Sequence, residues 1–287
     1  FHGTWSDYGR TKMSLFQLES VKNAIVNIDD EFGRTILDQI GGQKVVWSCS
    51  CLSSVSLRTA PKITATGVVS KAEGTKFTLN YTNSKYILNT SLVGMFNVAN
   101  LLLVIGALLL SGYEIRDVRK VLKALGGVPG RMECCGITPN GALVFVDYAH
   151  TPDGLKAALS SLRALTDREV CVVFGCGGGR DKTKRPIMGS VAYELADSII
   201  LTSDNSREEK TKAIINDILI GIRKIDKTKV VFDRVEAIST AIDLAQNGDI
   251  ILVAGKGHEI FQELDGKKFK CDDRAEIRKF LSGVVND

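Results

Sequence analysis

The second half of the chain alternates short, continuously apolar runs with longer amphipathic segments. The apolar runs show no alternation with polar residues, which is typical of strands buried on both faces of a parallel sheet. They lie at 142–147, 169–174, 198–202, 229–232 and 249–254, and the helical patterns between and after them lie at 152–165, 186–196, 208–225, 235–245 and 272–281. This order predicts an α/β unit with a mostly parallel sheet covered on both faces and right-handed crossovers.

The first half has a mixed pattern. Helical spacing at 8–21 and 29–42 flanks short strands at 24–29 and 44–49, and the alternation over 62–91 predicts antiparallel strands. A very apolar helix at 95–110 and a shorter one at 115–124 follow. The GGVPGR segment at 126–131 breaks any element, so we predict two domains, 1–129 and 130–287.

Composition narrows the class of protein. Hydrophobic residues make up 44% and charged residues 24%, as in globular proteins, and the net charge of +4 comes from scattered basic residues that predict no nucleic-acid binding. Seven cysteines without a CxxC pair indicate a reducing compartment, and we expect a cytoplasmic protein. The apolar run at 101–110 is too short to span a bilayer, so no membrane insertion is expected.

Candidate chemistry gathers where four predicted strands end. The polar segments there are DYAHTP at 147–152, GCGGGRDKTKRP at 175–186, SDNSREE at 203–209 and GKGHE at 255–259. Ligands of parallel α/β sheets bind at the carboxyl ends of the strands, which lie along one edge. The four segments together therefore predict one site, although each alone is a weak signal.

The glycine loop is no ordinary phosphate loop. No Gly-Lys-Ser/Thr closes it, and Arg180 stands where a dinucleotide fingerprint has its third glycine, which disfavours a dinucleotide oxidoreductase. An arginine there suits a carboxylate or a phosphate, although a solvated basic loop is an equally simple interpretation.

The other strand ends also allow two interpretations. Asn205 and Arg207 can bind a ligand, or the segment can cap a helix with Glu208 and Glu209 in its first turn. Glu259 opposite two arginines makes a site for a zwitterion such as an amino acid. Asn97, at the start of the most apolar helix, either bonds within the core or contacts a ligand.

Seven segments, in chain order, resemble one family. They are HGTWSDYGRTKMSLF, GMFNVAN, GVPGRME, DYAHTPDGL, GCGGGRDKTKRP, SDNSR and GKGHE. The chain is thereby similar to the Mur ligases, the ATP-dependent amide-forming enzymes of peptidoglycan synthesis, and most of all to those that add meso-diaminopimelate to UDP-N-acetylmuramoyl-L-alanyl-D-glutamate. The resemblance implies the C-terminal part of a central ATP-binding domain, with a mixed sheet, over 1–129, and a Rossmann-like amino-acid-binding domain over 130–287.

The resemblance also implies the chemistry and its residues. ATP phosphorylates a substrate carboxylate, and the amine of diaminopimelate attacks the acyl phosphate with the help of Mg²⁺. Lys12, as a carbamate that orients the metal, and His150 match catalytic positions. The family's nucleotide positions match Asn97, Arg131 and Asp147, and its diaminopimelate positions match Arg180, Asn205, Arg207, Gly255 and Glu259. A monomer is expected.

Some features leave alternatives open. The family's N-terminal domain and GTNGKT phosphate loop have no match, so we expect a truncated chain that is inactive alone. Gly179 and Ser206 replace the usual aspartate and proline. Addition of lysine or another amino acid remains possible, as does an amino-acid-binding fragment without catalysis, but Arg207 favours diaminopimelate because lysine lacks a second carboxylate.

Overall fold

The computed structural model describes residues 5–40, 44–51 and 61–283. The chain divides into two compact units, 1–126 and 127–287, and the division falls inside the GGVPGR segment. An α/β architecture with mixed sheets is observed, which confirms the predicted fold class.

The first unit is built on a five-stranded mixed sheet in the order β1-β2-β3-β4-β5. Neighbours β1, β2 and β3 pair in parallel, whereas β3, β4 and β5 pair in antiparallel fashion. The strands are β1 (Asn23–Asn27), β2 (Val45–Ser50), β3 (Ile63–Lys71), β4 (Gly74–Tyr81) and β5 (Ser84–Thr90), and the helices are α1 (Trp5–Gln17), α2 (Glu31–Gln39), α3 (Met95–Leu110) and α4 (Ile115–Ala124).

Helix α3 supplies much of the core of the first unit. It packs against β1, β2 and β3, and its side chains Leu101, Leu102 and Ile105 are buried there with Phe77 and Leu79 of β4. Its apolar composition therefore serves burial in protein. Within 5–40, 44–51 and 61–283, no helix combines the length and apolarity that a membrane crossing needs.

The second unit contains a six-stranded sheet in the order β10-β9-β8-β11-β7-β6. Every neighbouring pair is parallel except β6 with β7, so the predicted mostly parallel sheet is confirmed. The strands are β6 (Glu133–Ile137), β7 (Leu143–Asp147), β8 (Val170–Phe174), β9 (Ser198–Leu201), β10 (Thr228–Val230) and β11 (Ile250–Ala254), and the helices are α5 (Pro152–Arg163), α6 (Lys184–Leu195), α7 (Thr211–Leu219), α8 (Arg234–Leu244) and α9 (Asp273–Ser282).

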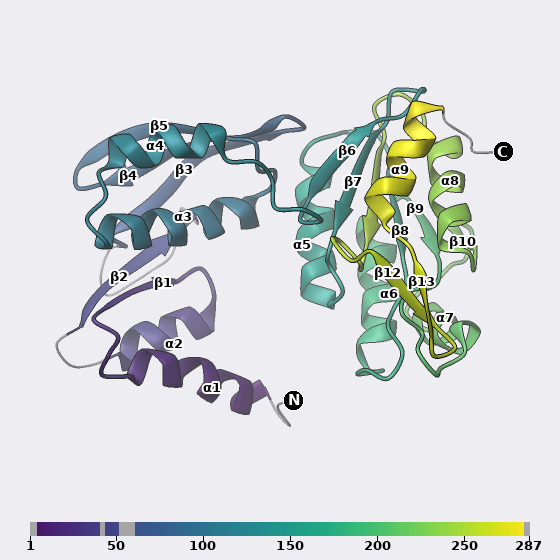
Figure 1. The fold of residues 1–287 in the computed structure, drawn as a ribbon, viewed down its shortest axis with the longest axis horizontal. Helices are drawn as coiled ribbons and strands as arrows, with labels where there is room; N and C mark the ends of the chain where they lie inside the picture. The colour runs from purple at the N-terminus through teal and green to yellow at the C-terminus, as the bar shows by residue number, and fades with distance from the viewer. Residues whose placement is uncertain (1–4, 41–43, 52–60, 284–287) are drawn as a thin grey trace. The chain divides into compact units, whose positions relative to one another are not determined.

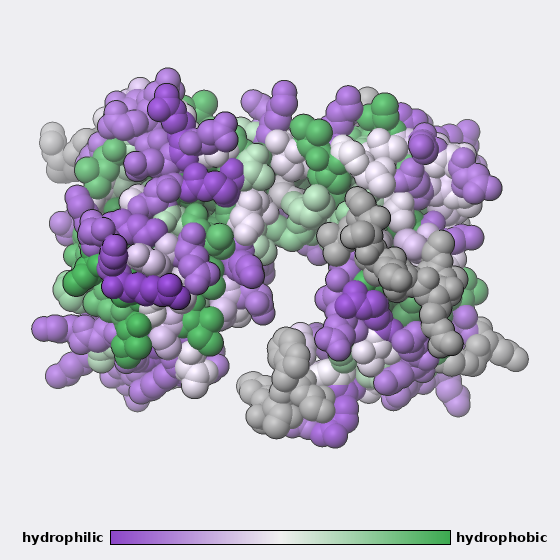
Figure 2. Space-filling view, turned by 180° about the vertical axis from the view of Figure 1, so that it is seen from behind, coloured by the Kyte–Doolittle hydropathy of each residue, from purple (hydrophilic) through white to green (hydrophobic). Residues whose placement is uncertain are grey.

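Helices cover both faces of this sheet. Helices α5, α6 and α7 pack side by side on one face, and α8 packs with α9 on the other (Figure 1). Val144, Phe145 and Leu252 of the strands are fully buried. Hydrophilic residues predominate on the face of the molecule drawn in Figure 2, with patches of hydrophobic residues among them.

The strand order creates a switch point. From β7 the chain runs outward through β8, β9 and β10, and then returns to insert β11 between β8 and β7. The chain connections on the two sides of β11 therefore run in opposite directions along the sheet. Ligands of open α/β sheets bind at such a point, beyond the carboxyl ends of the strands.

Two features of the second unit were missing from the predicted elements. Strand β6 adds an antiparallel edge with an irregular register between Cys134 and Gly136, and a short hairpin follows β11. The hairpin consists of β12 (Phe261–Leu264) and β13 (Lys267–Lys270). Its turn residues Asp265 and Gly266 both have positive φ, at 48° and 70°, as a type I′ turn requires. The Asp-Gly dipeptide was the available signal.

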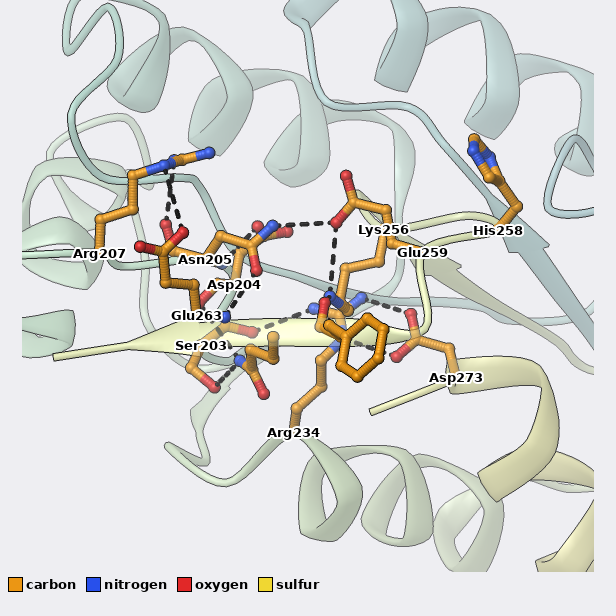
Figure 3. Close-up of polar contacts among 12 residues, drawn as sticks. Ser203, Asp204, Asn205, Arg207, Arg234, Lys256, His258, Glu259, Glu263 and Asp273 are labelled. Atoms are coloured by element: carbon orange, nitrogen blue, oxygen red, sulfur yellow. Dashed lines mark hydrogen bonds and ion pairs between the residues drawn. The ribbon is translucent and has the colours of Figure 1, made fainter. Parts of the chain in front are cut away.

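A fully buried ion pair ties the strand ends together. The Arg234 Nε and Nη2 atoms each donate to the Asp273 carboxylate at 2.8 Å, and both side chains have 0% exposure (Figure 3). The same guanidinium donates to the Ser203 carbonyl at 3.1 Å and to the Ala254 carbonyl at 3.0 Å. One side chain thus joins the ends of β9 and β11 to α9.

Replacement of one partner should be costly. Arg234→Met should lower the free energy of unfolding by about 3–5 kcal/mol, because the Asp273 carboxylate stays buried without a partner. Urea unfolding measures the loss. The double variant Arg234→Met/Asp273→Leu should recover part of it, and Arg278→Met, at an exposed arginine paired with Glu133, serves as the control. Equal, small losses for Arg234→Met and Arg278→Met would contradict this account.

Candidate functional site

The carboxyl edge of the six-stranded sheet surrounds a cavity of about 500 Å³. Loops that follow β7, β8, β9 and β11 all contribute, as the positions of their polar segments predicted. The lining residues are Tyr148, His150, Thr151, Gly175, Cys176, Gly177, Arg180, Asp181, Lys184, Asp204, Asn205, Arg207, Gly255 and Glu259. Six predicted site residues therefore share one cavity: His150, Arg180, Asn205, Arg207, Gly255 and Glu259.

Asn205 and Glu259 are bonded to each other across the cavity wall. The Asn205 side-chain amide donates to Glu259 Oε2 at 2.9 Å, and the buried Lys256 Nζ lies 3.5 Å from the same oxygen (Figure 3). Lys256 also donates to the Phe261 carbonyl. Since the contacts from Asn205 and Lys256 both use Oε2, the Glu259 carboxylate keeps Oε1 for another donor.

Arg207 is held from several sides. Its φ of 53° is in the left-handed region, and backbone bonds join it to the hairpin: its N–H donates to the Glu263 carbonyl at 3.1 Å, and the Gly266 N–H donates to its carbonyl at 3.2 Å. The Nη1 atom donates to the Gly178 carbonyl at 2.6 Å and to the Asn205 carbonyl at 3.3 Å. The hairpin that the sequence pattern missed therefore positions a predicted ligand-binding residue.

The glycine loop provides a second arginine, and two glycines of the site, one in this loop and one after β11, have special geometry. Arg180 is exposed and lines the cavity. Gly179 has a φ of 60°, and a Cβ there would lie 3.6 Å from the Arg207 Cδ, an ordinary contact. Gly179 therefore adopts a left-handed conformation without the strain of a side chain. At Gly255, with a φ of 113°, a Cβ would lie 2.7 Å from an Asp204 carboxylate oxygen, so the backbone approaches too closely for a side chain.

Aromatic and basic groups cluster after β7. The Tyr148 ring is 4.7 Å from the His150 ring and 5.5 Å from the His258 ring, and the Arg131 guanidinium lies 4.4 Å from its centroid. The His150 Nδ1 lies 2.8 Å from the Tyr148 carbonyl, which can only accept, so Nδ1 carries the hydrogen and Nε2 is the acceptor of a neutral ring. Lys184 donates to the His150 carbonyl at 2.7 Å.

Asp147 lies at the end of β7 and is buried. One carboxylate oxygen accepts from the Met132 N–H at 2.7 Å and the other from the Ala149 N–H at 2.8 Å. Burial raises the pKa of Asp147 above its ordinary value, while these two hydrogen bonds and Arg131 act in the opposite direction. The carboxylate thus joins the segment that carries Arg131 to the end of β7.

Two further predicted residues belong to the first unit. Lys12 is exposed on α1, with its Nζ 5.3 Å from the centroid of the Tyr8 ring. Asn97 is buried in the first turn of α3, where its amide donates to the Val93 carbonyl at 2.8 Å. This is the hydrogen bond within the core that the sequence allowed as an alternative to ligand binding. It leaves the amide oxygen of Asn97 for another donor.

Glu209, in the loop after β9, does not have the helix-capping position that one interpretation of the sequence gave it. Helix α7 begins at Thr211, so Glu209 is not in its first turn. Instead Glu209 accepts two hydrogen bonds from the fully buried Arg185, at 3.0 and 3.1 Å, and one from the Gly179 N–H at 2.8 Å. Arg185 also bonds to Asp217 of α7 at 2.8 Å. These hydrogen bonds, which we call the Arg185–Glu209 clamp, hold the glycine loop against the loop that carries Arg207.

Two family models match the chain. The Mur ligase middle domain matches residues 1–108, and the Mur ligase, glutamate ligase domain matches residues 130–257. Together they leave only short segments of the chain unmatched.

Curated proteins and solved structures give the same result. The chain is 38% identical over 99% of its length to the UDP-N-acetylmuramoyl-L-alanyl-D-glutamate--2,6-diaminopimelate ligase of Clostridium botulinum and 39% identical over 98% of its length to that of Clostridium tetani, and it spans 57% and 56% of these relatives. A solved structure of a ligase of that name is 34% identical, with a TM-score of 0.63, and the match covers 99% of this chain and 57% of the other.

The fold extends to more distant proteins. A MurF ligase from Thermotoga maritima, solved in complex with ADP, is 14% identical with a TM-score of 0.69, and the match covers 99% of this chain and 58% of that one. At this identity the likeness concerns the fold alone.

The Arg185–Glu209 clamp predicts an acid-dependent loss of stability. Hydrogen bonds from Arg185 and then from Gly179 lower the pKa of Glu209 from 4.5 to about 2. A lowered pKa contributes stability above the unfolded-state value and loses it as the pH falls through the folded-state value. The stability difference between the parent and Glu209→Gln should therefore be constant above about pH 5 and should shrink toward pH 2. Urea unfolding at several pH values measures it, and a difference independent of pH would refute the clamp.

Proposed function

The chain belongs to the Mur ligase family, and from this we propose that the protein of which it is part adds meso-diaminopimelate to UDP-N-acetylmuramoyl-L-alanyl-D-glutamate. Mur ligases use ATP, and the proposed reaction proceeds through an acyl phosphate. Residues 1–129 then form the C-terminal part of the ATP-binding domain, and 130–287 form the amino-acid-binding domain. The similarity to ligases of that name over nearly the whole chain supports this assignment.

One observation carries the choice of amino acid. Two arginines, Arg180 and Arg207, line the same cavity as the carboxylate of Glu259. Diaminopimelate has two carboxylates and two ammonium groups, whereas lysine has one carboxylate. A second arginine is useful only to a ligand with a second carboxylate, because guanidinium groups bind carboxylates in pairs of parallel hydrogen bonds.

The hydrogen bonds suggest an orientation for this ligand. Arg207 and Asn205 suit the distal carboxylate, and the Oε1 atom of Glu259 suits the distal ammonium, since Asn205 and Lys256 already occupy Oε2. Gly255 allows the backbone to approach the ligand. Arg180 takes the other carboxylate, which leaves the remaining amine for attack.

We also propose residues for the ATP side of the reaction. Arg131, Asp147 and Asn97 are the proposed nucleotide contacts, and His150 is the proposed catalytic residue near the transferred phosphate. Mg²⁺, when bound, would neutralise the charge that develops on the phosphate. Lys12 is exposed and so accessible to CO₂, and its carbamate would give an anionic oxygen ligand that suits this ion. Over 5–40, 44–51 and 61–283, no group of three His, Cys, Asp or Glu side chains is arranged to hold a metal ion.

The residues of this chain then contribute to the reaction by positioning the amino-acid substrate. The charges of Arg180, Arg207 and Glu259 fix both ends of a zwitterion, so the attacking amine meets the acyl phosphate in one orientation, and such positioning is a major source of rate. We further propose a cytoplasmic monomer. Lysine addition and non-catalytic binding are the alternatives that the next experiment separates.

Amino-acid-dependent phosphate release by the intact protein tests the proposal. With ATP and the nucleotide-sugar dipeptide present, meso-diaminopimelate should stimulate release and L-lysine should not. Equal stimulation by lysine would refute the assigned role of Arg207. Calorimetric binding of diaminopimelate without any phosphate release would favour the non-catalytic alternative.

Substitution of Arg207 sharpens the test. Arg207→Met should raise KM for diaminopimelate by about 10- to 100-fold, the value of one or two hydrogen bonds to a charged group. KM for ATP should stay within about twofold, because ATP does not contact this residue in the proposed arrangement. Arg223→Met, at an exposed arginine beyond α7, is the matched control. An unchanged KM for diaminopimelate would show that Arg207 does not bind this substrate.

A further inference from the structure

The side chain of Glu263 faces Arg207 from the hairpin. Its Oε2 atom lies 3.9 Å from the Arg207 Nε, and both side chains are about one-third exposed (Figure 3). No proposed role in the reaction uses this carboxylate. It is nevertheless a negative charge beside the residue that should receive a ligand carboxylate.

The donors of Arg207 are unequally available. Its Nη1 atom, which carries two hydrogens, already donates to the Gly178 and Asn205 carbonyls. A carboxylate that binds in the paired manner must therefore use the other edge of the guanidinium, formed by Nε and Nη2. Glu263 lies beside that same edge.

The position of Glu263 is set by its backbone. Its N–H donates to the Asn205 Oδ1 atom at 2.9 Å, and its carbonyl accepts from the Arg207 N–H at 3.1 Å. These bonds hold the residue beside Arg207 whatever its side chain is. The carboxylate can therefore be neutralised without removal of the contacts that shape the site.

We propose that Glu263 is a specificity-determining residue that competes with the distal carboxylate of the amino-acid substrate for the Nε edge of Arg207. In the empty site it partly neutralises the guanidinium. The distal carboxylate of a substrate must displace the Glu263 carboxylate from this edge. An amino acid without a second carboxylate does not compete with Glu263. This inference rests on the proposed function, and it predicts that Glu263 weakens the preference for diaminopimelate.

Neutralisation of Glu263 tests the competition in the intact protein. Glu263→Gln should lower KM for meso-diaminopimelate by about 2- to 5-fold, the range of a weak exposed ion pair. Its dissociation constant for diaminopimelate, measured by calorimetry, should fall in parallel. The affinity for L-lysine should change by less than about twofold, because lysine does not contact the Nε edge. A structural defect would weaken binding of both amino acids, so the selective gain is diagnostic.

Asp265→Asn is the matched control. It removes the same charge from the same hairpin, and asparagine tolerates the φ of 48° at this turn position. Its affinity for diaminopimelate should equal that of the parent. A second variant, Glu263→Asp, keeps the charge but withdraws it from Arg207, and it should give an intermediate affinity.

The outcomes separate this inference from the proposed function. If the parent uses diaminopimelate and Glu263→Gln binds it equally or more weakly, competition by Glu263 is refuted while the function stands. Weaker binding would assign Glu263 to support of Arg207 or to the ligand's ammonium. If the parent neither binds nor uses diaminopimelate, the proposed function fails, and this inference fails with it.

Discussion

The buried pair of Arg234 and Asp273 is the interaction on which the geometry of the site depends. Charges removed from water are costly unless every donor and acceptor is used, and here the guanidinium serves a carboxylate and two strand-end carbonyls. Ala254 is the last residue of β11, and Ser203 lies in the first residues of the loop after β9. Asn205 and Glu259, which are joined by a hydrogen bond of 2.9 Å, follow in the loops after β9 and β11.

A second constraint concerns the balance of charge around the cavity. Basic groups in and near the cavity are paired with acidic groups: Glu209 lies with the buried Arg185, and Glu263 lies with Arg207, which lines the cavity. The two pairs differ in strength, since Arg185 is buried with two-point contact whereas Glu263 lies 3.9 Å from its partner. The strong pair shapes the loops, and the weak pair leaves Arg207 available to a carboxylate that binds better.

Local pattern was sufficient for most of the regular elements of the fold. The apolar helix at 95–110 and the helix at 115–124 have the bounds that the sequence predicted, because long periodic segments carry a strong signal. Strand β6 was missed because five residues that include a bulge show no clear alternation. The hairpin was missed because β13 is highly charged, although Asp265-Gly266 was a readable turn signal.

The sequence by itself determined the class of the fold, the edge of the sheet where polar residues gather, and the family resemblance with its candidate residues. Each of these depends on order along the chain, which motifs and periodicity record directly. Only the tertiary structure decided that β11 inserts between β7 and β8, that Glu209 holds the glycine loop, and that the hairpin brings Glu263 beside Arg207. These contacts join residues far apart in the chain or in adjacent loops, and burial and long-range hydrogen bonding select them, so no local pattern specifies them.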